Sequence, residues 1–433
     1  NWTVAPGRAI SSSMWGRKNR DFAIFARRGL SRHPGTMLSV DEARRRLIEA
    51  ATPPSGRRHV PVSQALNLVL AGDVFSEVDV PPANNSAMDG YAFCHGDARR
   101  AGFDLPVSQR IAAGHSPSPL AAGSAARIFT GGEIPEGADT VAMQEDCRLL
   151  ADGARVQIDP GVSEGANIRP RGQDIGSGER ILAVGTRLRP QELGLLSSVG
   201  IARVAVYRPL RVAIFSTGDE LVEPGKPLKP GQIYNSNRAT LTGIVTALGM
   251  EALDLGNVPD TARATEKVLF KAAAEADVVV SSGGVSVGEE DHVKASVAKL
   301  GKVDFWKTAI KPGKPLAFGS VGGKPFLGLP GNPASVFVVG LILVRPFLLA
   351  QQGARFREPT PRWVPALFDR RGGKREEYLR ARLTEKGAEL FPNQSSGVLS
   401  SACWGDGLVM QPPDTPVRAG EQVMFYSYGD LLS

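Results

Sequence analysis

The sequence predicts a multidomain α/β plus β protein, with a central parallel-sheet domain over residues 206–352 and β-rich regions on either side. Within 206–352, short apolar runs alternate with helical patterns, which is typical of a parallel sheet with right-handed crossovers. Residues 106–160 and the tail from about 361 instead hold short alternating runs separated by glycine and proline, which indicates β structure. A chain of 433 residues is also too long for one hydrophobic core.

The central domain is expected to begin with a strand at 211–215 and to continue as helix, strand and helix. We expect these later elements at 237–248, 251–255 and 261–276. Two further apolar runs end in loops, at 276–280 and 325–329. The longest apolar run, 334–344, stops at Arg345 and Pro346, so it is too short to span a bilayer and is predicted to form a buried helix.

Fewer helices are expected outside the central domain. Residues 38–50 carry a helical pattern, with Ser39 as the N-cap and Glu42 completing a capping box. Residues 62–70 and 190–198 also favour helices, whereas the tail from 361 shows no helix signal. We therefore expect a C-terminal domain, 353–433, made only of strands.

Composition favours an ordinary globular, cytoplasmic enzyme, with 42% hydrophobic and 22% charged residues. The three cysteines form no CxxC pair and no zinc spacing, so reduced thiols are expected. The net charge of +7 is concentrated in residues 1–36, which carry +6, so the rest of the chain gives no argument for binding nucleic acid. This basic leader suits a transit peptide, but an untranslated or disordered leader ahead of Met37 is the favoured interpretation.

A glycine-rich loop offers the first sign of chemistry. The segment SSGGVSVGEED, 281–291, follows an apolar run, and three lysines follow it in KTAIKPGKP: Lys307, Lys311 and Lys314. Glycines let backbone N–H groups approach an anion, but carboxylates in the same loop would repel a phosphate unless a divalent cation lay between them. The pattern indicates a metal-assisted oxyanion site; alone, it could equally be a tight turn that needs positive φ.

The same domain has two similar loops, STGDEL at 216–221 and GLPGNPAS at 328–335. In the second, Asn332 is suited to be the N-cap and Pro333 the first residue of a helix. Because the loops after parallel strands gather along one sheet edge, one group of residues should lie together there. These are Glu220, Asp260, Gly283, Gly284, Asp291 and Asn332.

A fifth motif lies far upstream, PPANNSAMDGYA at 81–92, and by itself it indicates only a surface turn. Together with STGDEL, SSGGVSVGEED, KPGKP and GLPGNPAS it resembles the molybdopterin molybdenumtransferase family, which contains MoeA and the E domains of gephyrin-like proteins. The resemblance covers the chain from about Met37 to the C-terminus. It marks residues 206–352 as the molybdopterin-binding domain.

The resemblance implies insertion of molybdate into adenylyl-molybdopterin with release of AMP, assisted by Mg²⁺. It also implies an elongated, discontinuous linker domain, 37–75 and 161–205, with a β domain inserted at 76–160. A two-fold dimer would share each active site between subunits, with handover between this protein and molybdoenzymes or an adenylyltransferase. No membrane or nucleic acid partner is expected.

The resemblance also assigns roles to residues. Glu220 and Asp291 would hold the cation, and Asp260 would either join them or orient the pterin. Lys307, Lys311 and Lys314 would hold phosphate or molybdate. Further catalytic positions are Asp89 and Thr130, and further substrate-binding positions are Arg169, Asp174, Ser282, Gly283, Gly284, Asn332, Ser335, Arg375 and Ser396.

One position departs from the family pattern, since Asn84 stands where the family usually has an acid before NSAMDG. An asparagine can cap a turn but carries no charge, which removes any electrostatic role there. Two alternative functions remain, an adenylyltransferase and a non-enzymatic scaffold. An adenylyltransferase would be a small single domain without the SAMDGYA region, and a gephyrin-type scaffold would need a fused partner domain or linker.

Overall fold

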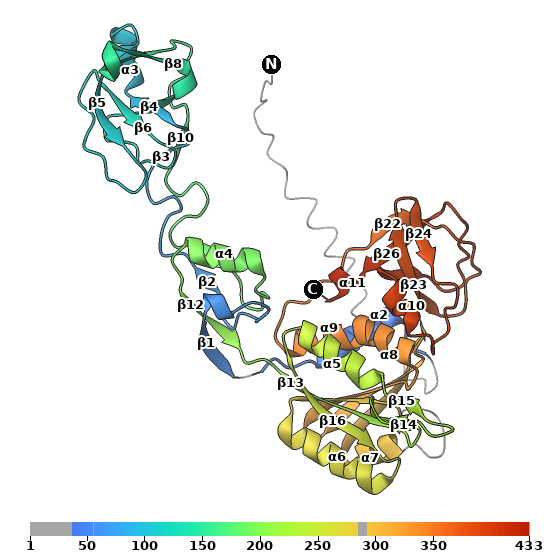
Figure 1. Ribbon diagram of the computed structural model, residues 1–433. Helices are drawn as coiled ribbons and strands as arrows, with labels where there is room; N and C mark the ends of the chain where they lie inside the picture. Colours follow the sequence, from blue (N-terminus) through green and yellow to red (C-terminus); the bar gives the residue numbers. More distant parts are fainter. Residues whose placement is uncertain (1–36, 55, 285–291, 433) are drawn as a thin grey trace, which may run out of the picture.

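The computed structural model describes residues 37–54, 56–284 and 292–432. The basic leader at 1–36 and Asp291, which is predicted to be a metal ligand, therefore lie outside the described residues. The described chain forms an elongated molecule (Figure 1). A small β domain lies at one end, a slender middle domain follows, and a globular body holds the central sheet and the C-terminal strands.

The central domain contains a six-stranded sheet in the order β16-β13-β17-β21-β20-β18. The first four strands are parallel, as predicted, and the last two add an antiparallel edge. The strands are β13 (Arg211–Thr217), β16 (Glu251–Val258), β17 (Val278–Ser282), β18 (Gly301–Lys307), β20 (Pro315–Val321) and β21 (Lys324–Leu329). The helices α5 (Asn237–Ala247), α6 (Ala262–Glu275) and α7 (His292–Leu300) lie between them along the chain.

The buried helix predicted from the long apolar run is confirmed, and it continues past Arg345. It runs from Pro333 to Gln351 as α8 (Pro333–Val339), a π-helical turn (Gly340–Val344) and α9 (Arg345–Gln351). The wider turn directly precedes Pro346, where a regular helix would clash with the proline ring and lose a hydrogen bond. The helix is long and apolar enough to cross a membrane, but 83% of its most apolar 18 residues are buried inside the protein. It is the central core helix.

Helix α2 (Val40–Ala50) packs against this core helix through Leu47 and begins as predicted. The Ser39 hydroxyl accepts a hydrogen bond from the Glu42 amide at 3.1 Å. The second half of the expected capping box is not formed. The Glu42 carboxylate instead pairs with Arg45 at 2.7 Å and Arg46 at 2.6 Å.

The middle domain joins two distant parts of the chain. Strand β1 (Arg57–Pro61) pairs with β12 (Arg203–Tyr207), and β2 (Val74–Phe75) pairs with β11 (Arg180–Leu182). The predicted helix α4 (Pro190–Ser198) is confirmed.

The helix expected at 62–70 is wrong, because only a 3₁₀ turn, Val62–Gln64, forms there. Asn67 adopts φ 65° and ends any helix. Just beyond it, the amide of Leu70 bonds the carbonyl of Thr186 at 2.9 Å. The apolar run thus serves the middle-domain strands rather than a helix.

The β domain is a six-stranded sheet in the order β7-β4-β6-β5-β9-β8, with one short helix, α3 (His95–Arg100). Its core is built on Phe93, Leu105 and Ile158, all fully buried. The strands are β4 (Gly90–Phe93), β5 (Asp104–Ile111), β6 (Ala125–Ile128), β7 (Thr140–Met143), β8 (Cys147–Leu150) and β9 (Arg155–Ile158). All three cysteines of the chain are free thiols, as expected.

The C-terminal sheet has the order β19-β23-β25-β26-β22, with β24 (Gly387–Leu390) paired to β23 (Glu376–Thr384). The other strands are β19 (Ile310–Lys311), β22 (Arg362–Pro365), β25 (Gly407–Gln411) and β26 (Gln422–Ser427). The domain was predicted to contain only strands, but it also has two short helices of five residues each, α10 (Ser400–Trp404) and α11 (Tyr428–Leu432). Strand β19 belongs to the KPGKP segment of the central domain, so the two domains share this sheet.

The core helix gives the first prediction. Phe347 is fully buried and makes an edge contact with Phe318, ring centres 5.7 Å apart, whereas Phe270 on α6 is 73% exposed. Phe347→Ala should lower the free energy of unfolding by about 3–5 kcal/mol, since it leaves a cavity. Phe270→Ala, the matched control, should change it by under about 0.5 kcal/mol. Denaturant titration measures both, and equal losses would contradict this description of the core.

Candidate active site

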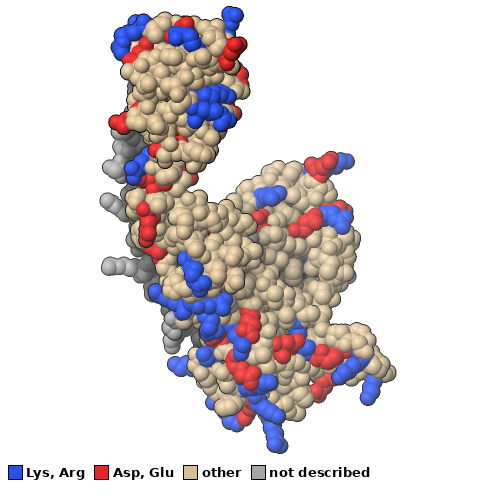
Figure 2. All heavy atoms as spheres, turned by 60° about the vertical axis from the view of Figure 1, so that its left-hand side comes forward, with Lys and Arg blue, Asp and Glu red and all other residues tan. Residues whose placement is uncertain are grey.

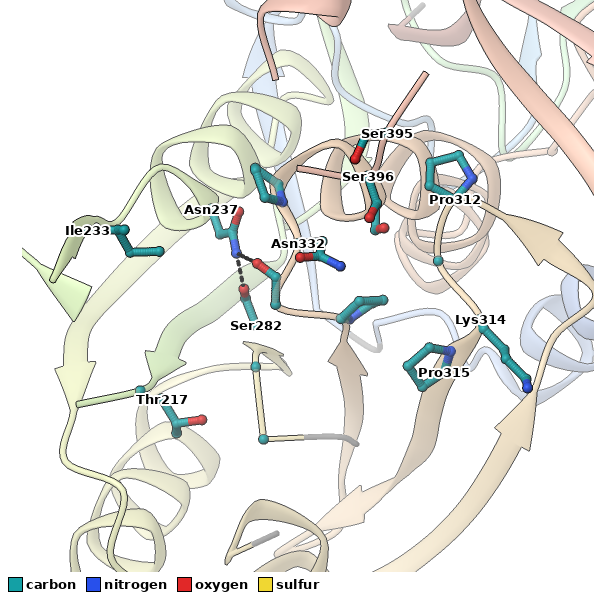
Figure 3. Close-up of a pocket in the computed structure, with 18 of the residues that line it drawn as sticks. Thr217, Ile233, Asn237, Ser282, Pro312, Lys314, Pro315, Asn332, Ser395 and Ser396 are labelled. Atoms are coloured by element: carbon teal, nitrogen blue, oxygen red, sulfur yellow. Dashed lines mark hydrogen bonds between the residues drawn. The ribbon is translucent and has the colours of Figure 1, made fainter. Parts of the chain in front are cut away.

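A cavity of about 840 Å³ opens at the carboxyl edge of the central sheet. Its walls are the loops after β13, β17 and β21, the KPGKP segment after β19, and a loop of the C-terminal domain (Figure 3). Parallel strands bring their carboxyl ends together, so this is where an α/β sheet binds ligands. The cavity lining includes Glu220, Asp260, Ser282, Gly283, Gly284, Lys311, Lys314, Asn332, Ser335, Arg375 and Ser396, all assigned in advance from the sequence.

The two acids of the cavity lie on neighbouring loops. Gly218, with φ 148°, lets the Glu220 carboxylate fold back: a Cβ at Gly218 would lie 2.5 Å from Glu220 Oε2. The amide of Asp260 donates to the Asp219 carboxylate at 3.1 Å, which joins the two loops. Asp260 Oδ1 is buried and has no hydrogen-bond partner among the described residues. It is therefore an open acceptor that a cation or a ligand N–H group would satisfy.

The glycine pair in SSGGVS is required by packing. Gly284 has φ 63°, and a Cβ there would lie 2.4 Å from Val293 Cγ2. The amide of Gly283 donates to the carbonyl of Leu329 at 3.1 Å, so this N–H is used within the sheet edge. The N–H group of Gly283 is therefore not free to bind an anion, contrary to the expectation that both glycine amides would do so.

Asn237, at the start of α5, connects three loops and was missed from the sequence. Its side-chain amide donates to Ser282 Oγ at 2.8 Å and to the carbonyl of Gly331 at 2.7 Å (Figure 3). The side chain is buried, and its Oδ1 has no partner in the described part of the chain. The sequence does show a polar residue, Asn237, at the expected start of a helix in QIYNSNR. That pattern fits a solvent-exposed helix cap equally well, so it does not identify a residue of the site.

The lysines do not share one position. Lys311 lines the cavity on β19, and its Nζ donates to Glu377 Oε1 at 2.9 Å. Lys314 is exposed at the rim. Lys307 ends β18, is exposed and lies outside the cavity lining. Only two of the three predicted lysines therefore reach this cavity.

Glu377 connects the cavity to the C-terminal domain. It is buried on β23, where it lies opposite Lys311 in the parallel pairing of β19 and β23. Its second oxygen accepts a hydrogen bond from Arg370 at 2.7 Å. Burial raises the pKa of Glu377, but the hydrogen bonds from Arg370 and Lys311 outweigh it and hold the pKa below its usual value. The carboxylate stays charged and fixes Lys311.

The C-terminal domain also covers the mouth of the cavity with Arg375, Gln394, Ser395 and Ser396. Arg375 donates to the carbonyl of Ile310 at 3.0 Å, and the carbonyl of Ser396 accepts from the amide of Ala334 at 2.9 Å. The Ser396 carbonyl therefore bonds the helix N-terminus that Asn332 was expected to cap. Asn332 holds the N-cap position, but its side chain makes no capping bond.

The remaining predicted residues lie elsewhere. In the β domain, the backbone N–H and hydroxyl of Thr130 both donate to Asp89 Oδ1 at 2.7 Å, and these bonds lower the pKa of Asp89. The pair stands beside β3 (Asn85–Ser86) and β6, at the far end of the chain from the cavity (Figure 1). Within one chain, the structure does not bring them to the other site residues.

Arg169 and Asp174 lie in the return segment below this pair. Arg169 is in β10 (Ile168–Arg169), which pairs with β3, and the amide of Asp174 donates to the carbonyl of Val80 at 2.9 Å. No ion pair joins them in the described chain. Asn84, the residue that departs from the family pattern, accepts from the amide of Arg171 at 2.8 Å, so its side chain holds this segment in place.

The donor set suits a hard divalent cation. Glu220 and Asp260 present carboxylates to the cavity. No group of three His, Cys, Asp or Glu forms a metal site within the described residues. Mg²⁺ nonetheless commonly binds through one or two protein carboxylates, with water and substrate phosphates as its other ligands. The residues present therefore fit Mg²⁺ bound together with a phosphate substrate.

The second prediction concerns Glu377. Glu377→Gln should lower the free energy of unfolding by about 2 kcal/mol, because two charged hydrogen bonds are lost. The pKa of Glu377 is lower in the folded protein than in the unfolded chain. The stabilisation from its charged hydrogen bonds is therefore fully present above the ordinary glutamate pKa, and it is lost as the pH falls through the pKa of the folded state. Denaturant titrations near neutral pH and below about pH 4 measure the difference. Exposed Glu389→Gln is the control; a pH-independent gap would contradict the assignment.

Comparison with known proteins supports the same arrangement. Three family models match in order: the MoeA N-terminal region, domains I and II, at residues 38–200; a probable molybdopterin binding domain at 213–350; and the MoeA C-terminal region, domain IV, at 364–428. A molybdopterin molybdenumtransferase of Haemophilus influenzae is 43% identical over 326 residues, covering 75% of this chain and 80% of that protein.

Two further comparisons agree. The molybdopterin molybdenumtransferase of a Nostoc species is 40% identical over 327 residues, 72% of this chain and 73% of that protein. A crystal structure of the molybdopterin biosynthesis MoeA protein from Pyrococcus horikoshii aligns with a TM-score of 0.79 at 30% identity, covering 91% of this chain and 100% of that one. The expected family and fold class are confirmed. The chain belongs to the MoeA family, the molybdopterin molybdenumtransferases of molybdenum cofactor biosynthesis.

Proposed function

We propose that this chain inserts molybdate into adenylyl-molybdopterin and releases AMP, with Mg²⁺ as cofactor. The observation that carries the proposal is that the cavity at the carboxyl edge of the central sheet combines carboxylates with cations. Its lining includes the acids Glu220 and Asp260 together with Lys311, Lys314 and Arg375. A volume of about 840 Å³ lies within the range of cofactor-sized ligands.

The chain's residues would act by positioning and charge neutralisation. Cleavage of a phosphoanhydride by water needs stabilisation of developing negative charge more than a protein nucleophile. Lys311, immobilised by Glu377, supplies a fixed positive charge, and Arg375 another at the cavity mouth. Bound Mg²⁺, held by Glu220 together with Asp291, would neutralise phosphate oxygens. Asp260, with its unsatisfied Oδ1, would accept an N–H from the pterin or join the cation ligands.

Ser282, Ser335 and Ser396 add hydroxyl groups to the lining, and Asn332 adds an amide that is not used for capping. These groups can orient the substrate without adding charge. Two oxyanions, a phosphate and molybdate, must be bound near each other, so neutral hydrogen-bond donors complement the cations. We assign these four residues to substrate binding on that basis.

We further propose that a two-fold dimer completes the site. Asp89 and Thr130 form an ordered pair with a charged carboxylate, yet they lie at the opposite end of the chain from the cavity. A closed two-fold pair of elongated chains can place the β domain of each subunit over the cavity of the other. Arg169 and Asp174, at the base of the β domain, would then line the same cleft. Sedimentation analysis should give the mass of two chains.

The direct test uses purified protein with adenylyl-molybdopterin, Mg²⁺ and molybdate. AMP release and activation of an apo-molybdoenzyme should both occur, and EDTA should abolish them. Glu220→Ala should lower AMP release by about 100-fold or more, since the phosphates lose charge compensation. Glu385→Ala, an exposed acid in the turn before β24, is the control. Full activity in EDTA would contradict the metal assignment.

Asp89→Asn separates chemistry from ligand binding. This variant should lose AMP release, while pyrophosphate and molybdate still bind the cavity of the same chain, because the cavity contains no β-domain residue. Asp152→Asn, in an exposed turn of the same β domain, should behave as wild type. Turnover assays and calorimetric titration measure the two properties. Wild-type turnover by Asp89→Asn would exclude a role for this carboxylate.

A further inference from the structure

A second cavity, of about 620 Å³, lies where the middle domain meets the core helix and the segment that leads into the C-terminal domain. Its lining is strongly basic, with six arginines against three acids. The arginines are Arg187, Arg189, Arg345, Arg355, Arg357 and Arg362, and the acids are Glu192, Glu358 and Asp430. Figure 2 shows blue Lys and Arg side chains gathered where the middle domain joins the globular body, on the face drawn there.

The acids leave most of this positive charge uncompensated. Glu192 pairs with Arg189 at 2.6 Å, and Glu358 pairs with Arg44, outside the cavity, at 2.7 Å. Arg187, Arg355, Arg357 and Arg362 form no ion pair with any carboxylate of the described chain. The cavity lining thus includes at least four such arginines.

Two arginines of the lining lose solvation: Arg345 is buried and Arg187 is partly buried. Arg187 donates from Nη2 to the carbonyl of Ala247 at 3.0 Å, but its Nε is buried with no partner among the described residues. Arg345 is buried, and its guanidinium lies 5.8 Å from the ring centre of Phe356. Burial, and after it the charge of Arg187, lower the pKa of Arg345 to about 10. An anion between them would relieve this repulsion.

We propose that this cavity is a second anion site, which binds a small phosphate-bearing molecule with two or more negative charges. Guanidinium groups present paired N–H donors that match phosphate oxygens, and a concave site of several hundred cubic ångströms suits a ligand of nucleotide size. Thr360 adds a hydroxyl donor to the same lining, whereas the Thr186 hydroxyl already donates to the carbonyl of Ala183 at 2.7 Å. Because the lining comes from the middle domain, the core helix and the 354–362 segment, bound phosphate would fasten these three parts together.

The test is calorimetric titration of the full chain with inorganic pyrophosphate, with orthophosphate and molybdate as separate arms. Wild type should bind pyrophosphate at two sites per chain, one of them the sheet-edge cavity. The double variant Arg187→Gln, Arg357→Gln should lose one site or weaken it at least tenfold. Lys314→Gln should weaken only the other, and Arg418→Gln, an exposed arginine elsewhere in the C-terminal domain, should change neither.

Folding of each variant is checked by thermal melting. If the Arg187 change unfolds the protein, the exposed pair Arg357→Gln, Arg362→Gln serves in its place. Unchanged stoichiometry and affinity in the double variant would overturn the proposal. Binding of only one pyrophosphate per chain by the wild-type protein would also overturn the proposal. In that case the partner subunit of a dimer, and not a phosphate compound, would occupy the basic cavity. Binding of molybdate alone at this site would overturn the assignment to phosphate compounds.

Discussion

The parallel pairing of β19 with β23 is the contact on which the candidate active site depends. It sets Lys311 opposite Glu377, so a lysine of the KPGKP segment joins the sheet of the C-terminal domain. A buried carboxylate without its two cationic partners would cost several kcal/mol, so the pairing and the charge network require each other. Through this contact the C-terminal domain positions a cation in the cavity of the central domain.

A second constraint is the distance between the two sets of site residues. The cavity gathers side chains from two domains of the globular body, while Asp89 and Thr130 are held together on the β domain at the far end. Both groups are ordered within one chain, and neither needs the other to form. The slender middle domain, built from two separate stretches of sequence, sets their separation. The elongated shape of the chain therefore determines how far apart the two groups of predicted site residues lie.

The sequence predicted the cavity well because strand ends are local features. Glu220, Asp260, Gly283, Gly284 and Asn332 each follow a recognisable strand or open a helix, and parallel topology brings them together. What it missed depends on contacts between distant residues. The pairing of β19 with β23 and the bridging role of Asn237 have no local signal.

The differences between the expected and the observed structure have local physical causes. The helix at 62–70 failed because Asn67 takes a positive φ, which an apolar pattern cannot reveal. The core helix passes Pro346 because a π-helical turn makes room for the ring. Lys307, which the family resemblance groups with Lys311, ends a strand outside the cavity lining, and its role stays a prediction.

The central claim is that the β domain of one subunit completes the cavity of the other. Mixing Asp89→Asn and Glu220→Ala homodimers under conditions that exchange subunits tests it most directly. Each heterodimer should contain one doubly altered cleft and one wild-type cleft, so AMP release should recover to as much as half the wild-type value per heterodimer. If mass analysis confirms exchange and activity stays at background, the two acids act within one chain and the claim is wrong.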